Sequence, residues 1–153
     1  MSMFAARQEL TEEQRLSKAI VAIMNDDRHI AMAGLLMVAN WEVRDDIPTA
    51  CTNGRDVWFG RAFISTLTDA ELRFVVLHEL YHIIYRHLIT WKHLHDMNHK
   101  CANHACDYVI NLQIVDAHKD GFVKMPEGAL YDKRFRDKDA EQVFNILYDG
   151  NGG

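Results

Sequence analysis

Cysteine is scarce in this chain of 153 residues, which contains only 3. Cys51, Cys101 and Cys106 are odd in number and none lies in a CxxC pair. A disulfide framework and a structural zinc knuckle are therefore not indicated. We expect Cys106 to pack as a small buried residue.

Long apolar runs and an excess of positive charge are also absent. No uncharged apolar stretch approaches the roughly 20 residues that span a bilayer, and Met1 to Leu10 lacks the apolar core of a signal peptide. We therefore expect a cytoplasmic protein that binds no membrane. The net charge of −5 argues against a nucleic-acid partner. A local basic cluster is expected to be a solvated loop; it comprises Lys133, Arg134, Arg136 and Lys138.

The composition is that of a small globular protein. At 153 residues and 48% hydrophobic, the chain can bury a real core. It has no internal repeats and no room for a second domain. The sequence thus predicts a single domain spanning residues 1–153 and leaves its oligomeric state open.

The stretch His78-Glu79-Leu80-Tyr81-His82 carries most of the functional information. Residues four apart on a helix share one face, so His78 and His82 can each present a ring nitrogen to the same ion. Glu79 would then stand beside the metal as a base. An HExxH string on a helix is typical of a zinc hydrolase.

The residues before this motif are typical of a helix start, because Thr68 and Glu71 have the spacing of a capping box. We expect a helix from about Thr68 to Thr90. Its apolar residues cover nearly the whole circumference, as in a buried helix. Two imidazoles and a carboxylate buried without partners would each be costly, whereas one cation would be a partner for all three. The alternatives are a solvated surface helix and a core with hydrogen-bonded histidines.

A catalytic zinc usually has a third protein ligand and an open position for water. A second core helix, expected from Asn98 to Lys119, carries His104, Asp107 and Asn111. Asp107 and Asn111 are four apart, so one could bind the metal while the other orients a ligating histidine. We favour Asp107 as the third ligand. His104, one turn earlier, is the main competitor, and His87 follows the motif very closely.

The metzincin pattern is excluded, since it requires glycine and histidine where this chain has Tyr85 and Leu88. The segments HELYHIIYRH at 78–87 and NHACDYVIN at 103–111 instead resemble the family called "putative metallopeptidase domain" of bacteria and their phages. That family often neighbours a von Willebrand A-like domain. The likeness continues in the Pro48-Thr49 turn and in residues 125–147.

The resemblance implies a zincin-like α+β fold, in which a small antiparallel or mixed sheet packs on the HExxH helix and a second ligand-bearing helix. It also implies zinc bound by His78, His82 and Asp107, with Glu79 as catalytic base. Two imidazoles and a carboxylate suit zinc better than magnesium or calcium, although iron, cobalt and nickel accept them too.

The remaining elements are expected to surround these two helices. A capping box at Thr11 predicts a helix to about Asn25, and a last helix is expected over Asp139–Tyr148, with a frayed end at Gly150–Gly153. We expect a helical turn over residues 30–36, followed by a strand over Met37–Val43 that ends before Pro48.

Two strands, Thr49–Thr52 and Asp56–Phe59, flank Asn53-Gly54, a dipeptide that suits a tight hairpin turn with positive φ at both centres. Val57-Trp58-Phe59 is the candidate edge strand of the cleft, where a peptide could bind as an added strand. Alternatively, Trp58 and Phe59 are core residues of a buried strand.

The sequence therefore predicts a zinc-dependent peptidase that hydrolyses a peptide or protein substrate through a metal-activated water and Glu79. The alternative is a catalytically silent metal-binding protein that acts as an interaction module; the presence of Glu79 favours catalysis. The His-rich segment 87–104 is either a lid, a second and weaker metal site, or a solvated connection. Five side chains could stabilise an oxyanion and are not ranked: Tyr81, Tyr85, His104, Tyr108 and Tyr131.

Overall fold

The computed structural model describes residues 9–88 and 91–150, and for 86–88 it describes the backbone only. Its helices and strands together confirm the α+β class. Several predicted features lie outside the described part: the side chain of His87, the predicted end of the motif helix at 89–90, the terminal residues 151–153 and most of Met1 to Leu10. The elements are, in order, α1 (Glu12–Met24), η1 (Asp27–Met32), α2 (Ala33–Val38), β1 (Asn40–Arg44), β2 (Ala50–Thr52), β3 (Asp56–Gly60), α3 (Arg61–Ser65), α4 (Asp69–Leu88), α5 (Lys92–Met97), α6 (His99–Ala117), η2 (Lys133–Phe135) and α7 (Ala140–Gly150).

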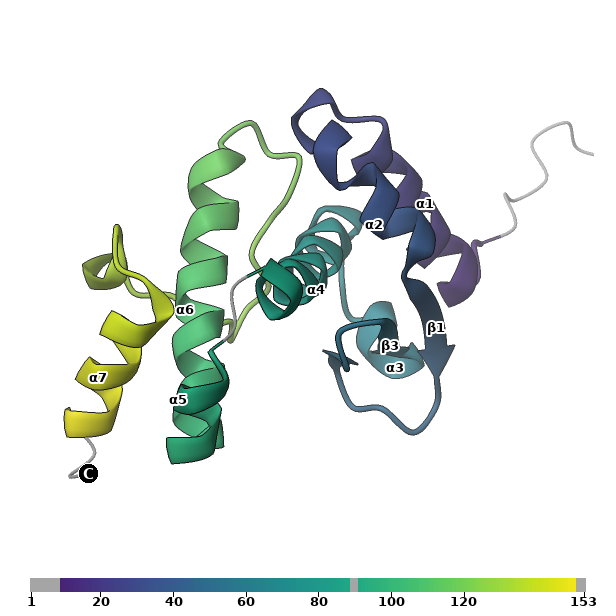
Figure 1. Ribbon diagram of the computed structural model, residues 1–153. Coiled ribbons are helices and arrows are strands. Elements are labelled where there is room, and N and C mark those ends of the chain that lie inside the picture. Colours follow the sequence, from purple (N-terminus) through teal and green to yellow (C-terminus); the bar gives the residue numbers. More distant parts are fainter. Residues whose placement is uncertain (1–8, 89–90, 151–153) are drawn as a thin grey trace, which may run out of the picture.

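The HExxH helix α4 occupies the centre of the molecule (Figure 1). It lies between α6 on one side and α1 with the sheet on the other, and α7 covers the far side of α6. Apolar side chains of α4 therefore contact neighbours in several directions. This position explains why its sequence is apolar around nearly the whole circumference.

Local capping signals fix the starts of the predicted helices. At α1 the Thr11 hydroxyl accepts from the Gln14 amide, and the Gln14 side chain accepts from the Thr11 amide. Thr68 and Glu71 form the same reciprocal pair before α4, at 3.2 and 2.9 Å. Asn98 caps α6 by accepting from the Cys101 amide at 3.0 Å. Each bond satisfies an amide that the first helical turn leaves free.

The sheet has the order β1-β3-β2 within the described residues, with β1 and β3 parallel and β2 and β3 antiparallel. The prediction that Val57-Trp58-Phe59 is an edge strand is therefore wrong, because β3 is the central strand. Its buried Val57 and Phe59 belong to the core instead. The strand nearest α4 is β2, which packs against that helix and has an open edge.

The antiparallel pairing of β2 with β3 was predicted, but the turn between them differs. Three residues, Asn53, Gly54 and Arg55, connect the strands, and of these Gly54 alone has positive φ. The Asn53 side-chain oxygen accepts from the Arg55 and Asp56 amides at 2.9 and 2.7 Å. This side-chain bonding forms an Asx-type turn, so Asn53 need not adopt a left-handed conformation.

The strand predicted over Met37–Val43 begins later, at Asn40. Residues up to Val38 continue α2, which buries Leu36 while Met37 and Val38 are 72% and 74% exposed. A strand would have buried alternate residues, whereas one short helical turn buries a single apolar residue per turn. The apolar run did not distinguish the two structures.

Two apolar clusters meet at α6. The first joins α1, β3 and α4 to one face of α6 and includes Ile23, Phe59 and Ile110. The second joins α5 and α7 to another face and includes Leu94 and Phe144. With both faces packed, α6 is held firmly beside α4. Among the described residues, no helix combines the length and apolarity that crossing a membrane requires.

Candidate metal centre

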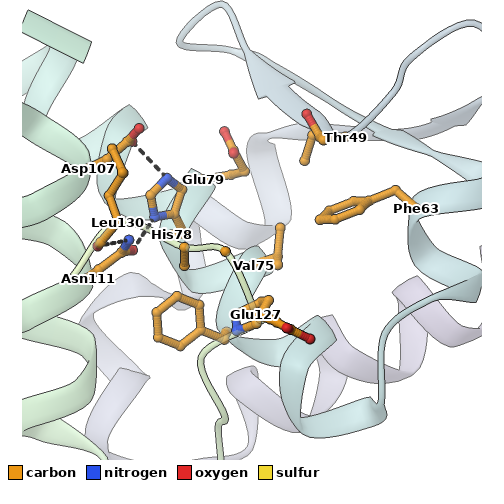
Figure 2. Close-up of a pocket in the computed structure, with 14 residues that line it drawn as sticks. Thr49, Phe63, Val75, His78, Glu79, Asp107, Asn111, Glu127 and Leu130 are labelled. Atoms are coloured by element: carbon orange, nitrogen blue, oxygen red, sulfur yellow. Dashed lines mark hydrogen bonds and ion pairs between the residues drawn. The ribbon is translucent and has the colours of Figure 1, made fainter. Parts of the chain in front are cut away.

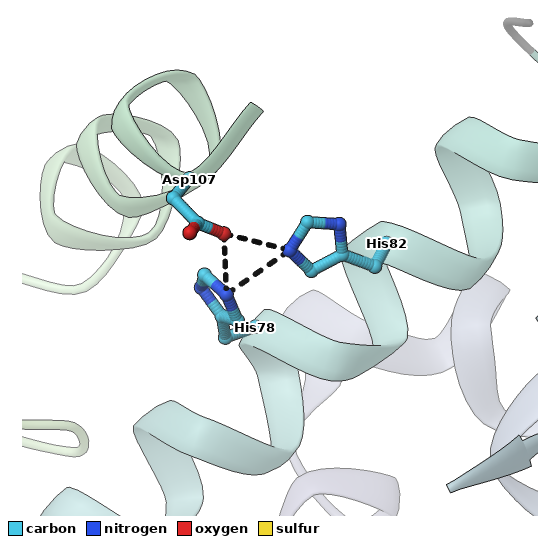
Figure 3. A group of neighbouring side chains, drawn as sticks. All are labelled: His78, His82 and Asp107. Atoms are coloured by element: carbon cyan, nitrogen blue, oxygen red, sulfur yellow. Dashed lines mark hydrogen bonds and ion pairs between the residues drawn. The ribbon is translucent and has the colours of Figure 1, made fainter. Parts of the chain in front are cut away.

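His78 and His82 lie one turn apart on α4, and Asp107 approaches them from α6 (Figure 3). The two Nε2 atoms are 3.1 Å apart. The Asp107 Oδ1 atom lies 3.1 Å from His78 Nε2 and 2.9 Å from His82 Nε2. Three potential ligand atoms thus form a nearly equilateral triangle. Within the described residues, this is the one group of three or more such side chains close enough to share an ion.

Asn111, one turn after Asp107 on α6, holds the ring of His78. Its side-chain Nδ2 donates to the Leu130 carbonyl at 2.8 Å. Its Oδ1 must therefore be the atom that lies 2.7 Å from His78 Nδ1, and it accepts the proton of that nitrogen. The Nε2 atom of a neutral His78 then carries a lone pair and no proton.

This lone pair lies 3.1 Å from the Asp107 carboxylate oxygen, which is itself an acceptor. Two acceptors at this distance repel each other unless a proton or a cation stands between them. Asn111 is buried and Asp107 is only partly exposed, so water screens this repulsion incompletely. The cluster is consequently arranged to bind a positive charge.

The pKa shifts of the three acidic and basic groups agree with this arrangement. Burial lowers the pKa of His78, but the carboxylates of Asp107 and Glu79 raise it by more. Burial likewise raises the pKa of Asp107, yet hydrogen bonds from His78 and His82 hold it well below its usual range. Burial raises the pKa of Glu79. The shifts of His78 and Asp107 favour a cationic charge among the ring nitrogens, whereas the shift of Glu79 favours its neutral form.

Glu79 lies beside the three ligand atoms rather than among them. Its side chain is buried, and it lines the same cavity as His78, Asp107 and Thr49 (Figure 2). The cavity has a volume of about 330 Å³. Glu79 thus lies between the three potential ligand atoms and the open space of the cavity.

The cavity has a polar side and an apolar side. The polar side carries the motif residues. Apolar side chains from α3, α4 and the loop after α6 form much of the remaining wall; they are Phe63, Phe74, Val75, Pro126, Ala129 and Leu130. Such a wall suits an apolar group of a bound ligand.

Other sequence candidates lie elsewhere. His104 belongs to the same helix as Asp107 but does not join the cluster. None of the five proposed oxyanion donors lines the cavity. Tyr85 donates to Gln113, and Tyr108 packs against Phe135.

The basic cluster near the end of the chain is exposed at Lys133, Arg134 and Arg136, as expected for a solvated segment, although part of it forms the short helix η2. Arg134 pairs with Asp132 at 2.7 Å, and Arg136 pairs with Asp116 at 2.8 Å. Both arginines are therefore partly neutralised by nearby carboxylates. Cys106 is buried as expected, and burial raises its pKa to about 11.

Two parts of the site were not identified from sequence. The segment 126–130 forms one wall of the cavity, and its Leu130 carbonyl fixes the amide of Asn111. Thr49 and Ala50 of the β2 region form another wall. The sequence marked the Pro48-Thr49 turn and residues 125–147 only as continuations of the family resemblance. Neither signal indicates which helix these segments contact.

Two imidazoles from one helix and a carboxylate from the next, beside a second carboxylate and a cavity, define the metallohydrolase class of site. The comparisons with known proteins agree. A family model described as "Putative metallopeptidase domain" matches residues 11–153, and the chain belongs to that family. Membership implies a metal cofactor and peptide or protein substrates. No curated protein matches the chain, and no solved structure matches it.

Proposed function

We propose that this protein is a zinc-dependent peptidase with His78, His82 and Asp107 as metal ligands. The observation that carries the proposal is the lone pair of His78 Nε2, which Asn111 directs at the Asp107 carboxylate 3.1 Å away. A cation removes the repulsion between these two acceptors. The proposal includes a zincin-like fold in which the whole chain, 1–153, is one domain.

Zinc is the metal that best fits the donor set. Two neutral imidazoles and one carboxylate are common ligands of catalytic zinc, which keeps a fourth position for water. The cavity borders the ligands and leaves room for that position. Magnesium and calcium prefer sites made of oxygen atoms. Asn111 then plays the usual part of a residue that orients a ligating histidine through its other ring nitrogen.

When bound, zinc supplies a Lewis acid and a water with a pKa near 7. Glu79 accepts the proton of the attacking water and transfers it to the nitrogen of the departing amine. Its burial removes competing solvent from this proton transfer. Positioned acid–base catalysis of this kind contributes roughly 10²- to 10⁴-fold to a rate.

The substrate is proposed to extend the sheet at β2. Gly60 N donates to Thr49 O, and Asn53 N donates to Asp56 O, so residues 49 and 53 direct their backbone groups toward β3. In an antiparallel pair this direction alternates, and the N–H and C=O of Ala50 point away from β3. Ala50 also lines the cavity with Glu79. A peptide could bond to this edge irrespective of most of its side chains.

The Glu79→Gln variant tests the mechanism. Glutamine keeps the shape of the side chain but cannot take a proton, so hydrolysis of a peptide library should fall by at least about 10²-fold while zinc content and thermal unfolding stay unchanged. Glu42→Gln, a change at an exposed carboxylate on β1, serves as the matched control and should retain activity. Full activity of Glu79→Gln would exclude Glu79 as the base.

A further inference from the structure

Outside the candidate zinc centre, a second pair of histidines brings two ring nitrogens together. His95 is in the last turn of α5, and His99 is the first residue of α6. Their Nδ1 atoms are 3.1 Å apart, the same separation as between the Nε2 atoms of His78 and His82. Two nitrogens bound to one tetrahedral zinc at about 2.05 Å lie roughly 3.3 Å apart. The pair therefore needs little movement to chelate an ion.

The junction between the two helices creates this geometry. Asn98 ends α5 and caps α6 with an extended backbone, so the two rings approach at the bend with centroids 5.0 Å apart. Leu94, fully packed in the second apolar cluster, anchors α5 against α6. The packing of the two helices thus places His95 and His99 side by side at the bend.

A side-chain amide orients the ring of His99. Asn103, one turn later on α6, places its amide nitrogen Nδ2 3.1 Å from His99 Nε2. In this orientation Nδ2 donates and Nε2 accepts. A flip of the amide exchanges its nitrogen and oxygen, after which Oδ1 accepts the Nε2 proton. His99 Nδ1 then carries the lone pair that a metal requires. At the candidate zinc centre, Asn111 already presents Oδ1 to the ring of His78, so the two contacts correspond only after the flip of Asn103.

We infer that His95 and His99 form a second site for a transition-metal ion such as zinc, copper or nickel, with water completing the coordination. Neutral imidazoles are preferred ligands of these ions. Among the described residues, no carboxylate or thiol joins the pair as a third ligand. The site is also distinct from the cavity, because neither histidine lines it. Eight residues, or about 12 Å along α6, separate His99 from Asp107.

The charges around the pair make the site weaker than the candidate zinc centre. Asp96 is adjacent to His95, but its carboxylate is paired with Lys92 at 2.9 Å. Lys100 follows His99, and the N-terminal end of α6 carries a partial positive charge that disfavours cations. Because the site has only two protein ligands and its surroundings are neutral to positive, we expect metal binding to be reversible and lost on dialysis. Bound metal would connect α5 to α6 and stabilise the folded chain.

Zinc titration by calorimetry on the chelator-stripped full chain tests this inference. The wild type should bind two zinc ions, one tightly and one weakly. His95→Ala and His99→Ala should each remove the weak site, with at least a tenfold loss in affinity, and keep the tight one. His93→Ala is the matched control, since His93 is an exposed histidine on the same short helix and has no part in the pair. It should bind two ions.

The outcomes also separate this inference from the proposed peptidase function. A single weak site that His95→Ala abolishes would support the histidine pair and contradict the three-ligand centre. A wild type whose weak zinc survives both His95→Ala and His99→Ala would overturn the inference. Equal losses in His93→Ala would overturn it as well, because they would show general binding to surface histidines.

Discussion

Asn111 has the most consequential single contact in the site. It joins the Leu130 carbonyl to the ring of His78 and thereby decides which nitrogen of that ring is free. The residue binds no metal in our account, yet it is buried and forms a hydrogen bond at each end of its amide. Groups that orient a ligating histidine typically change metal affinity by 10- to 100-fold.

Asn111→Ala should therefore weaken zinc binding by about 10- to 100-fold, measured by competition with a chromogenic chelator. Asn111→Asp is the informative companion, because its carboxylate still accepts from His78 Nδ1 but no longer donates to Leu130. Its other oxygen would face the Leu130 carbonyl, so the variant should lose some stability, yet it should bind zinc more tightly than Asn111→Ala. Unchanged affinity in Asn111→Ala would show that the ring of His78 needs no such partner.

At the residue scale, the sequence was sufficient to predict which side chains share a helix face, because those residues are close together along the chain. His78 and His82, or Asp107 and Asn111, share a face because they are four apart on a helix. The structure brings Asp107, and not His104, to the two histidines. That choice depends on how α6 is rotated against α4, which the packing of both clusters determines and no local pattern reveals.

Among the elements, the sheet depends on one close backbone approach. A side chain at Gly60 would place its Cβ 2.0 Å from the Ile47 carbonyl oxygen and 3.2 Å from that of Thr49. Gly60 N also donates to Thr49 O at 2.7 Å. The end of β3 is thus packed directly against the segment that leads into β2 and lines the cavity.

Gly60→Ala should force residues 47–49 away from β3 and cost roughly 1 to 3 kcal/mol of unfolding free energy, as other overpacking changes do. Urea unfolding measures the loss. Gly34→Ala in α2 is the control, because its Cβ would meet nothing within 4 Å and should stabilise the helix by about 0.5 to 1 kcal/mol. Equal stabilities for the two variants would contradict the contact at Gly60.

The elements show a clear division between what the sequence predicts and what it does not. Starts of helices at Thr11, Thr68 and Asn98 depend on side chains within three residues, and these predictions are confirmed. The place of β3 at the centre of the sheet depends on β1, which precedes it by 16 positions in register. A short apolar strand has the same sequence pattern at the edge of a sheet as at its centre. The prediction that Val57-Trp58-Phe59 is an edge strand was therefore wrong.

Across the whole molecule, a buried pair of histidines joins the N-terminal part of the chain to the end of α6. His118 Nδ1 donates to the Ile114 carbonyl at 2.7 Å, so its Nε2 accepts from His29 Nε2 at 2.8 Å. His29 Nδ1 is buried and has no hydrogen-bond partner in the part of the chain that the structure describes. His29 is thus neutral in the folded protein.

Burial, followed by the proximity of His118, lowers the pKa of His29 below its ordinary value of 6.5. Asp26, 3.5 Å away, opposes this shift, but Arg28 occupies the Asp26 carboxylate at 2.7 Å. Since the folded pKa is the lower one, the stability from neutral His29 is complete above pH 6.5 and is lost as the pH falls toward the folded pKa.

We therefore expect the free energy of unfolding to fall on acidification below about pH 6.5, by up to about 1.4 kcal/mol per pH unit for this one proton. His29→Gln should show a shallower fall, because glutamine can donate to His118 but does not titrate. Denaturant unfolding of both proteins at pH 7.5 and 5.5 gives the comparison. Parallel pH profiles would mean that His29 is not the group responsible.

The central claim, that His78, His82 and Asp107 bind one zinc, is tested most directly by elemental mass spectrometry of dialysed protein. Wild type, His78→Ala and Asp107→Ala are purified identically, with His104→Ala as the control for the competing ligand on α6. Our account predicts one zinc per chain in the wild type and in His104→Ala, and none in the other two. A wild type without metal after zinc is supplied, or an Asp107→Ala variant that retains zinc, would contradict it.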